Sequence, residues 1–377
     1  MKIGIVCPYN VAKGGGVQEI VYAQQAELLR RGHKAPIITP RPQDHDQAPR
    51  DNMIFVGGAT DFNSPAHTVV QLSASMRETI DNLLEEEQFD ILHFHEPWMP
   101  MLSWQMLSRS QTINVATFHA KLPETMMTRT MAKVITPYTK TVLKYIDSFT
   151  AVSDAAAEYV CSLTDEPVAI IPNAVSEKFQ LPKVIKDNRK QKNILYVGRL
   201  EGRKGVNYLL HAFKLVHDRH PDVSLIIAGD GPDRQKLEML AADLDLDRIT
   251  FLGHISDEDK IKLLHTSDLF CAPSLFGESF GVVLLEAMAS GLVTVAGDNP
   301  GYESVMRGLG ALSLINPKHS AEFARRLELL LYETDLRKLW RSWAAEEMPQ
   351  YRYGRIVDQY EEVYEQALAQ GKRRRDV

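Results

Sequence analysis

The stretch Asn193-Ile194-Leu195-Tyr196-Val197-Gly198 decides the fold. It is a short apolar run that ends at a glycine, and a longer helical pattern follows it. The same order recurs on both sides, because short β-rich runs alternate with longer helical patterns along the chain. Alternation of this kind is typical of βαβ units, so the sequence predicts an α/β protein with parallel sheets.

The predicted elements form two series. Strands of the first series are expected at residues 2–7, 35–39, 91–95, 114–118, 148–151 and 169–171. Those of the second series are expected at residues 193–198, 224–228, 249–251, 269–272, 294–296 and 312–315. The most prominent helices are expected at 17–31, 73–87, within 124–145, at 155–161 and at 353–370.

A chain of 377 residues exceeds the usual size of a single core, so two domains are expected. The charged, proline-flanked run at 180–192 reads as the linker between them. We therefore expect doubly wound domains at 1–180 and 181–352, with the segment 353–377 packing back on the first. Ligands of such sheets bind outside the carboxyl ends of the strands, so if the two ends face each other, the site is a deep cleft between the domains.

The composition excludes several classes of protein. Hydrophobic residues make up 44% and charged residues 24%, and the formal net charge of −6 argues against a nucleic-acid binder. The three cysteines, Cys7, Cys161 and Cys271, are scattered, so neither a disulfide framework nor a zinc site is expected. No run approaches about 18 apolar residues, and the apolar start is too short for a signal peptide. We expect a cytoplasmic protein.

The segment Glu278-Ser279-Phe280-Gly281-Val282 continues through apolar residues to Glu286. It reads as a glycine-containing loop that turns into an apolar helix, with a carboxylate near each end. Two such acids suit the hydroxyls of one extended ligand, and the helix N-terminus between them attracts an anion such as a diphosphate. A sugar nucleotide has this combination of groups. The alternative is an amphipathic helix with two solvated glutamates.

Three further turns follow predicted strands and carry glycine. Gly14-Gly15-Gly16 opens a helix, and its backbone allows close approach of a ligand. Gly198 is followed by Arg199 and Lys204, two cations that suit a departing diphosphate. Gly229-Asp230 follows another strand. The alternative for Gly14-Gly15-Gly16 is a flexible turn, and for Gly198 with its two cations it is a solvated basic turn. For Gly229-Asp230 the alternative is a simple turn.

Histidines stand at the ends of two predicted strands of the first half. His93 and His95 belong to one strand end, and His119 belongs to another. Polar residues at such ends face the ligand side of the sheet, so we expect these histidines to belong to a functional site. Of them, His119 is the better candidate for contact with a sugar hydroxyl. A hydrogen-bonded core histidine is the alternative. No third ligand is evident, so no metal site is expected.

Together these motifs resemble the retaining glycosyltransferases of family 4, whose GT-B architecture has two facing Rossmann-like domains. The resemblance covers nearly the whole chain. The motifs that carry it are Gly14-Gly15-Gly16-Val17-Gln18, His95-Glu96-Pro97, Phe118-His119, Gly198-Arg199 with Lys204, Gly229-Asp230-Gly231-Pro232, and Glu278 with Glu286. Within the family, the chain is most similar to bacterial phosphatidylinositol mannosyltransferases, which use GDP-mannose.

The resemblance implies a role for each matching residue. His119 would contact the sugar near the reacting carbon, Arg199 and Lys204 would neutralise the diphosphate, and Glu278 would hold the sugar hydroxyls. Gly16 would lie against the diphosphate, Glu286 would hold the ribose, and the backbone of Ile255 would meet the guanine. The full implied donor set is Gly15, Gly16, Gly198, Gly229, Asp230, Ile255, Ser279, Phe280, Gly281, Val282 and Glu286. The implied acceptor set is Tyr9, Gln18, Asn63 and His67.

The resemblance also implies the reaction. We expect transfer of a hexose, mannose from GDP-mannose, to a hydroxyl of a polyol, lipid-linked or glycan acceptor, without a metal or another cofactor. The basic, apolar mixture within 124–145 suits peripheral contact with an anionic membrane, and a helix whose methionines pack inward is the alternative. The alternatives are a UDP-sugar-dependent transferase (glucosyl or N-acetylglucosaminyl), a nucleotide-sugar epimerase, and a non-catalytic nucleotide-sugar-binding protein.

Two departures from the mannosyltransferase pattern concern the acceptor. The family's lipid-facing helix carries a basic run, whereas Ser75–Asp81 has one arginine and two acids. The arginine expected shortly after Asn63 is absent, and His67 is the basic residue in its place. Both departures weigh against phosphatidylinositol itself as the acceptor.

Overall fold

The computed structural model describes residues 1–11, 15–41, 52–63, 69–74, 77–120, 136–180 and 191–371, without the side chains of 58–63 and 69–74. The chain divides into two compact units, Met1–Asn173 with Tyr353–Val377, and Ala174–Arg352. The division therefore falls at Asn173, earlier than the boundary expected at residue 180. The residues 181–190 of the expected linker lie outside the described residues.

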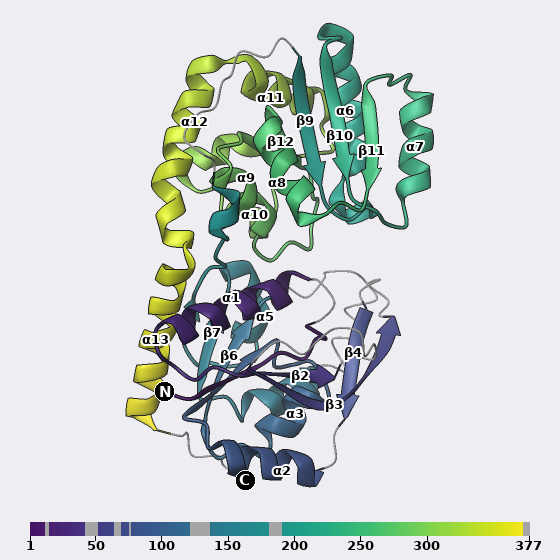
Figure 1. The fold of residues 1–377 in the computed structure, drawn as a ribbon. Helices are drawn as coiled ribbons and strands as arrows, with labels where there is room; N and C mark the ends of the chain where they lie inside the picture. Colours follow the sequence, from purple (N-terminus) through teal and green to yellow (C-terminus); the bar gives the residue numbers. More distant parts are fainter. Residues whose placement is uncertain are drawn as a thin grey trace. The chain divides into compact units, whose positions relative to one another are not determined.

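The first unit contains a sheet of eight strands among its described residues, in the order β4-β3-β2-β1-β5-β6-β7-β8 (Figure 1). The strands are β1 (Ile3–Val6), β2 (Ile37–Arg41), β3 (Met53–Asn63), β4 (Val69–Ala74), β5 (Ile91–His95), β6 (Ile113–Phe118), β7 (Ser148–Ala151) and β8 (Val168–Ile170). Neighbouring strands are parallel except for β3 and β4, which pair antiparallel. All residues of β1, β5 and β6 are buried, as expected for central strands covered on both faces.

The helices of this unit lie against the sheet (Figure 1). They are α1 (Gly16–Arg30), α2 (Arg77–Glu87), α3 (Leu102–Leu107), α5 (Asp154–Cys161) and α13 (Tyr353–Gln370). In α1 the buried residues Val21, Gln24, Gln25 and Leu28 recur at the spacing of one helical face. This face packs inward while the charged residues of the helix remain at the surface.

Two features of the first unit correct the sequence-based expectations. The helix expected at 73–87 is wrong at its start, because β4 runs to Ala74 and α2 begins at Arg77. The long strand β3 was not expected, since it contains Gly57 and Gly58, which strands disfavour. Its antiparallel pairing with β4 supplies the backbone hydrogen bonds that compensate. Of the helix expected within 124–145, residues 124–135 lie outside the described residues, and 136–143 are helical.

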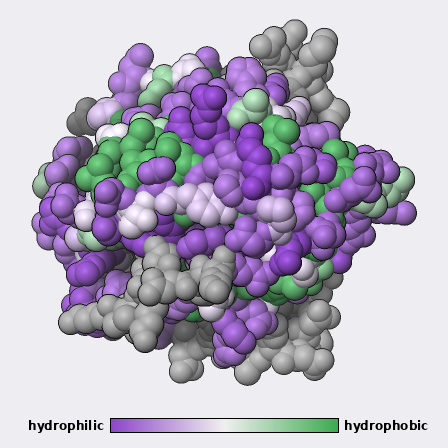
Figure 2. All heavy atoms as spheres, turned by 90° about the horizontal axis from the view of Figure 1, so that it is seen from above, coloured by the Kyte–Doolittle hydropathy of each residue, from purple (hydrophilic) through white to green (hydrophobic). Residues whose placement is uncertain are grey.

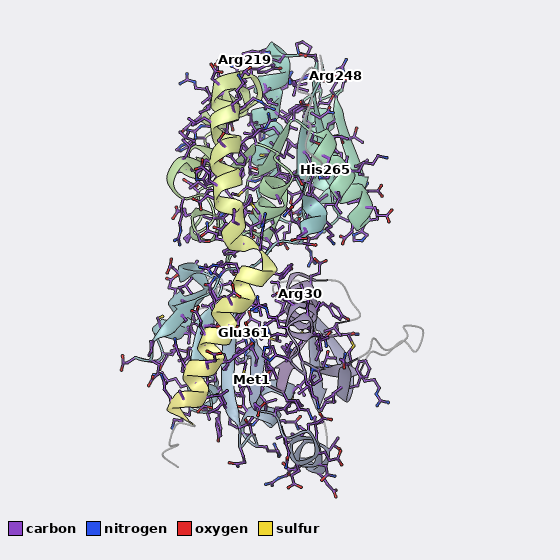
Figure 3. The ribbon with its side chains drawn as sticks, turned by 60° about the vertical axis from the view of Figure 1, so that its left-hand side comes forward. Met1, Arg30, Arg219, Arg248, His265 and Glu361 are labelled. Carbon is purple, nitrogen blue, oxygen red and sulfur yellow. The ribbon has the colours of Figure 1, made fainter. Side chains whose placement is uncertain are left out.

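The last helix, α13, is tied to the first unit by polar contacts. The Gln24 amide donates to the Tyr364 hydroxyl at 3.0 Å, and that hydroxyl lies 2.7 Å from Nδ1 of His93. At the surface, Oε1 of Glu361 lies 2.7 Å from Nε2 of His33, and Figure 3 marks Glu361 on this helix. A buried aromatic hydroxyl needs a hydrogen-bond partner, so this network fixes where α13 lies on its own unit.

The second unit contains a six-stranded parallel sheet in the order β11-β10-β9-β12-β13-β14. Its strands are β9 (Lys192–Val197), β10 (Val223–Ala228), β11 (Ile249–Gly253), β12 (Leu269–Ala272), β13 (Thr294–Gly297) and β14 (Leu314–Ile315). The chain moves outward from β9 in one direction and from β12 in the other. The order therefore reverses between these two neighbours, which is the point where such sheets bind ligands.

Helices flank this sheet as well (Figure 1). The α-helices are α6 (Val206–Arg219), α7 (Arg234–Asp243), α8 (Asp257–Thr266), α9 (Val282–Ala289), α10 (Pro300–Glu303), α11 (Ser320–Tyr332) and α12 (Thr334–Glu347). Short 3-10 helices are η1 (Glu177–Phe179), η2 (Gly202–Lys204), η3 (Gly308–Ser313) and η4 (Met348–Tyr351). The expected strand at 312–315 is confined to its last two residues, because η3 occupies the residues before Leu314.

The surface is mixed in character. Hydrophilic residues cover most of the face shown in Figure 2, and hydrophobic residues form separate patches on it. Within the described part of the chain, no helix is long and apolar enough to cross a membrane.

The network around Tyr364 can be tested by removing its hydroxyl. We expect Tyr364→Phe to lower the free energy of unfolding by about 1–2 kcal/mol, because Gln24 and His93 each lose a buried partner. Urea unfolding measures this change. The matched control is Tyr332→Phe, at a side chain that is 37% exposed. Equal effects of the two substitutions would show that the buried network contributes nothing specific.

Candidate functional site

In the second unit, two loops meet at the carboxyl ends of β9 and β12. These strands are adjacent, with Leu195 paired to Phe270. The loop after β9 contains η2, and the loop after β12 leads into α9. The Leu275 amide donates to the Arg203 carbonyl at 2.8 Å, so the backbones of the two loops are joined. The strand-order reversal thus lies beneath the residues that the sequence singled out.

The contact between these loops is an ion cluster, which we call the Glu278 cluster (Glu278, Lys204 and Arg203). Oε1 of Glu278 lies 2.7 Å from Nζ of Lys204 and 3.1 Å from Nη1 of Arg203. Nη1 of Arg203 also donates to the Gly277 carbonyl at 3.2 Å, and its Nη2 lies 2.7 Å from Oε1 of Glu201. One carboxylate oxygen is therefore shared by two cations from the neighbouring loop.

The protonation state of Glu278 follows from its surroundings. Burial opposes ionisation of the carboxyl, but Lys204, Arg203 and the Ser274 hydroxyl outweigh burial and lower the pKa of Glu278 below its ordinary value. The Ser274 hydroxyl lies 3.1 Å from that of Tyr302. Glu278 is thus a charged, firmly held acceptor of hydrogen bonds at neutral pH.

The other predicted cation, Arg199, lies further out. Its side chain is 45% exposed, and its Nε is 3.9 Å from Oε2 of Glu201, at the outer limit of an ion pair. The hydroxyl of Tyr196 donates to the Arg199 carbonyl at 2.9 Å and so fixes the backbone rather than the guanidinium. Lys204 and Arg199 therefore belong to one turn, but only Lys204 contacts Glu278.

The predicted glycine turns after β9 and β10 pack directly on each other. The Gly198 amide donates to the Ala228 carbonyl at 3.0 Å. Gly229 has a φ of 138°, and a Cβ at this position would lie 1.8 Å from the Gly198 carbonyl oxygen. Asp230 accepts from the Gly231 amide at 2.7 Å, as in a turn. The protein's own packing explains Gly229, so this glycine needs no ligand to account for it.

The start of α9 follows the sequence-based expectation of a loop that becomes an apolar helix. Gly281 caps the helix with a φ of 110°, and a Cβ there would lie 2.7 Å from a ring carbon of Tyr302. Phe280 is buried with its ring centroid 6.2 Å from that of Tyr351. Ser279 lies between Phe280 and Glu278, and Val282 is the first residue of the helix.

The second predicted carboxylate, Glu286, is buried within α9 and meets another cation. Its Oε1 lies 2.9 Å from Nζ of Lys260, which comes from α8. Ser256, which directly follows Ile255, caps α8 by accepting from the Asp259 amide at 3.1 Å. The cap fixes the first turn of α8, and Lys260 in that helix contacts Glu286.

In the first unit, Gly15 and Gly16 of the predicted glycine turn lie at the start of α1. Gly15 is the cap, and a Cβ on it would lie 2.4 Å from Oε1 of Gln18. Gly16 is the first helical residue, and no described atom lies within 4 Å of the position its Cβ would take. Packing among the described residues therefore does not explain why position 16 is glycine.

The structure describes the predicted acceptor residues Tyr9, Asn63 and His67 to different extents. Tyr9 follows β1, and burial, with Glu96 and Cys7 nearby, raises the pKa of its hydroxyl well above the ordinary value. Asn63 ends β3 with its backbone paired to Val69, but its side chain is outside the description. His67 and Gly14 lie outside the described residues.

The strand-end histidines fall into two environments. His93 is a core residue, because Gln24 and Tyr364 lie on its Nδ1 side and Thr117 lies 2.7 Å from its Nε2. Nε2 of His119 lies 2.8 Å from Nδ1 of His95. Burial lowers the pKa of His93 and of His119 to about 3 each.

Some residues of the site were missed by sequence analysis. Arg203 adjoins Lys204 in the motif, so its charge was visible, but only the fold shows that it shares the Glu278 carboxylate. Lys260 comes from another helix and gave no sequence signal as a partner of Glu286. Glu96 was read as part of a motif and not as a site residue. Its carboxylate accepts the His119 backbone N–H at 2.7 Å.

Among the described residues, no group of three or more His, Cys, Asp or Glu side chains is arranged to hold a metal ion. A cavity of about 550 Å³ in the first unit contains none of the candidate residues. Its lining is Asp81, Leu84, Glu85, Gln88, Phe89, Arg109, Gln111 and Thr112.

Comparison with protein families gives two matches that together span most of the chain. Residues 177–347 match the model described as glycosyl transferases group 1, and residues 14–179 match glycosyltransferase family 4. The phosphatidyl-myo-inositol mannosyltransferase of Mycobacterium leprae is 32% identical over 378 residues, covering 99% of each chain.

Solved structures agree on the fold. The sucrose-phosphate synthase of Thermosynechococcus elongatus has a TM-score of 0.77 at 18% identity, covering 98% of this chain and 99% of that one. Anabaena HepE in complex with UDP-glucose has a TM-score of 0.75 at 18% identity, covering 97% of this chain and 100% of that one. These comparisons and the two sheets confirm the expected α/β fold with two Rossmann-like domains of the GT-B class.

The buried histidines predict how stability depends on pH. The folded pKa of His93 and of His119 is about 3 against an ordinary 6.5, and burial also places that of His95 well below 6.5. The unfolded chain therefore binds more protons, and the stability these residues contribute above pH 6.5 is lost as pH falls toward 3. Burial raises the pKa of Glu96 to about 7, so this carboxyl changes the pH dependence of stability in the opposite direction. It is one group against the three histidines.

We expect the free energy of unfolding, measured with urea, to fall between about pH 7 and pH 5. His93→Gln should reduce the slope of this free energy against pH. Glutamine offers one donor and one acceptor as neutral imidazole does, but it cannot take up the proton. The control is His319→Gln, at an exposed side chain, which should leave the slope unchanged. The same slope in both variants would contradict a titrating role for His93.

Proposed function

The chain belongs to glycosyltransferase family 4, and we propose that it transfers a hexose, mannose from GDP-mannose, to an acceptor hydroxyl with retention at the anomeric carbon. The relative from M. leprae is named for transfer of mannose to phosphatidyl-myo-inositol, which supports the choice of sugar. The acceptor is proposed more broadly as a polyol, glycolipid or glycan, because the basic run and the arginine expected for phosphatidylinositol are absent from the sequence.

The observation that carries the proposal is the Glu278 cluster at the strand-order reversal of the second unit. A carboxylate held by two cations offers acceptors for sugar hydroxyls. The same cations offer charge for a phosphate, and they stand beside the carboxylate on the neighbouring loop. A sugar diphosphate presents hydroxyls and phosphate oxygens at neighbouring positions, so this cluster is matched to both parts of the ligand.

We propose the following donor contacts in the second unit. Lys204 and Arg199 bind the diphosphate, and the backbone N–H groups at the start of α9 add to them. Glu278 accepts hydrogen bonds from the transferred sugar, and Glu286 accepts them from the ribose. The backbone at Ile255 meets the guanine. Lys260, whose Nζ lies 2.9 Å from Oε1 of Glu286, holds that carboxylate in place beside the ribose.

The chemistry follows from where charge develops. As the bond between the anomeric carbon and the diphosphate oxygen breaks, negative charge grows on the leaving phosphate, and Lys204 and Arg199 stabilise it. The acceptor oxygen forms the new bond on the same face of the sugar. Its proton passes to the leaving phosphate, which becomes the protonated nucleoside diphosphate. Lys204 and Arg199 supply positive charge from one turn, so we propose that no metal is required.

Residues of the first unit take the remaining roles in this proposal. His119 contacts the sugar near the reacting carbon, and Gly15 and Gly16 approach the diphosphate through their backbone. Tyr9 and Gln18 bind the acceptor, and Asn63 and His67 belong to the same acceptor set. Peripheral contact with an anionic membrane, on the cytoplasmic side, belongs to the proposal for a lipid-linked acceptor.

The function is tested by donor turnover. We expect the purified chain to release GDP from GDP-mannose only when an acceptor from a polyol and glycolipid panel is present, with the α-anomeric configuration retained in the product by NMR and with EDTA without effect. Turnover of UDP-glucose or UDP-N-acetylglucosamine instead of GDP-mannose would show that the donor is that UDP-sugar. Release of a converted sugar without acceptor would favour an epimerase, and binding without turnover would contradict catalysis.

The Glu278 cluster is tested by substitution. We expect Lys204→Met and Glu278→Gln each to lower kcat/KM by on the order of 10²–10³, because each removes charge used in the transition state. Lys214→Met is the matched control, since it breaks an exposed ion pair with Asp218 on α6. Wild-type turnover in either cluster variant, at unchanged melting temperature, would remove that residue from the proposed mechanism.

The substitution Gly16→Ala distinguishes a ligand-binding role of this glycine from a structural one. Alanine at the first helical position should keep or raise stability by up to about 1 kcal/mol, since no described atom opposes its Cβ. If the diphosphate approaches here, Gly16→Ala should nevertheless weaken donor binding by tenfold or more, on the order of 1.4 kcal/mol. Calorimetry measures the binding and thermal unfolding the stability. Glu19→Ala in the same first turn is the control, and equal donor affinity in both variants would refute the approach at Gly16.

A further inference from the structure

His119 is held at two of its atoms by two consecutive residues. Its ring Nε2 lies 2.8 Å from Nδ1 of His95, and its backbone N–H donates to Oε1 of Glu96 at 2.7 Å. The two imidazole rings are stacked, with centroids 5.1 Å apart and planes 20° from parallel. All three residues lie at the carboxyl ends of the adjacent strands β5 and β6. The position of His119 is therefore determined by the end of β5.

The contact between the rings couples their protonation. Two neutral imidazole nitrogens at hydrogen-bond distance share one proton, so one ring donates and the other accepts. If His95 donates, the proton of His119 is on Nδ1, and if His95 accepts, Nδ1 of His119 is bare. Burial keeps both rings neutral because it lowers the pKa of each. The tautomer of His95 thus decides whether His119 offers a donor or an acceptor at Nδ1.

This arrangement differs from an ordinary core histidine. His93, two residues earlier, has polar partners for both ring nitrogens. In contrast, Nδ1 of His119 and Nε2 of His95 are buried without a hydrogen-bond partner among the residues that the structure describes. Buried polar atoms are normally satisfied, so a free ring nitrogen here calls for an explanation such as a bound ligand.

Glu96 adds a second, independent sign of function. It has a φ of 52°, a left-handed conformation that costs a non-glycine residue on the order of 1–3 kcal/mol, and it is 1% exposed. Its own amide donates to the Thr117 carbonyl at 3.0 Å, which continues the pairing of β5 with β6. The strained turn brings the carboxylate back to the His119 amide. A buried acid in a strained turn, with this contact as its result, is typical of a functional site.

We propose that His95 and Glu96 are positioning residues for His119, in which His95 sets the ring tautomer and Glu96 sets the backbone. The inference rests on the proposed function in one respect, namely that His119 meets the bound sugar. The coupling of the tautomers does not depend on that function, and it can be tested without any activity.

The tautomer is measured by nitrogen-15 NMR of the full-length chain with labelled histidine, with the His119 signals assigned through His119→Gln. We expect a single neutral tautomer for His119 in the wild type, and a change to the other tautomer or to a mixture in His95→Phe, which keeps a ring but removes the nitrogens. His254→Phe, at an exposed position, is the control and should leave the pattern unchanged. An identical His119 pattern in the wild type and His95→Phe would overturn the role of His95.

Kinetics test Glu96 and apply even if His95→Phe does not fold. Glutamine retains an oxygen that accepts the His119 amide, whereas methionine has a similar length without it. We expect Glu96→Met to lower kcat by on the order of 10- to 100-fold with little change in the donor KM, and Glu96→Gln to keep most of the wild-type kcat. Equal kcat in the two variants would overturn the positioning role of Glu96. A wild-type chain without turnover would sink the proposed function but leave the NMR result decisive for His95.

Discussion

The second unit depends on one carboxylate that two cations share. Glu278 is largely shielded from solvent in the loop after β12, with 13% of its side chain exposed, so an unpaired charge there would be costly. Lys204 and Arg203, from the loop after β9, offset that cost and join the two loops at the strand-order reversal. The cluster is therefore structural support, and in the proposed function it is also a binding surface. In that proposal, an incoming phosphate and the carboxylate draw on the same positive charge.

The two units solve the same problem with different chemistry. Each collects polar residues at the carboxyl ends of central parallel strands, where side chains leave the buried sheet. In the second unit these residues are charged, and they suit an anionic donor. In the first unit they are neutral histidines around His119 with a buried acid, Glu96, beside them. Neutral groups suit hydrogen bonding to hydroxyls, which both a sugar and a polyol acceptor present.

Sequence patterns identified the parts of this chain that local residues determine. The strand runs, the loop before α9 and the final helix follow from hydrophobic periodicity and from glycines that end elements. Strand β3 could not be expected from its glycines, because its pairing with β2 on one side and with β4 on the other stabilises it. Likewise, nothing local reveals that Lys260 meets Glu286 or that Glu96 reaches the His119 amide. Such contacts depend on strand order, which a single sequence does not specify.

The competition between Glu278 and phosphate for the same cations is tested most directly by calorimetric binding of GDP, which carries the diphosphate but no transferred sugar. If Lys204 and Arg203 serve both partners, Glu278→Gln should bind GDP more tightly than the wild type, because the competing carboxylate charge is gone. Weaker or unchanged GDP affinity in a folded Glu278→Gln protein would contradict the shared use of these cations.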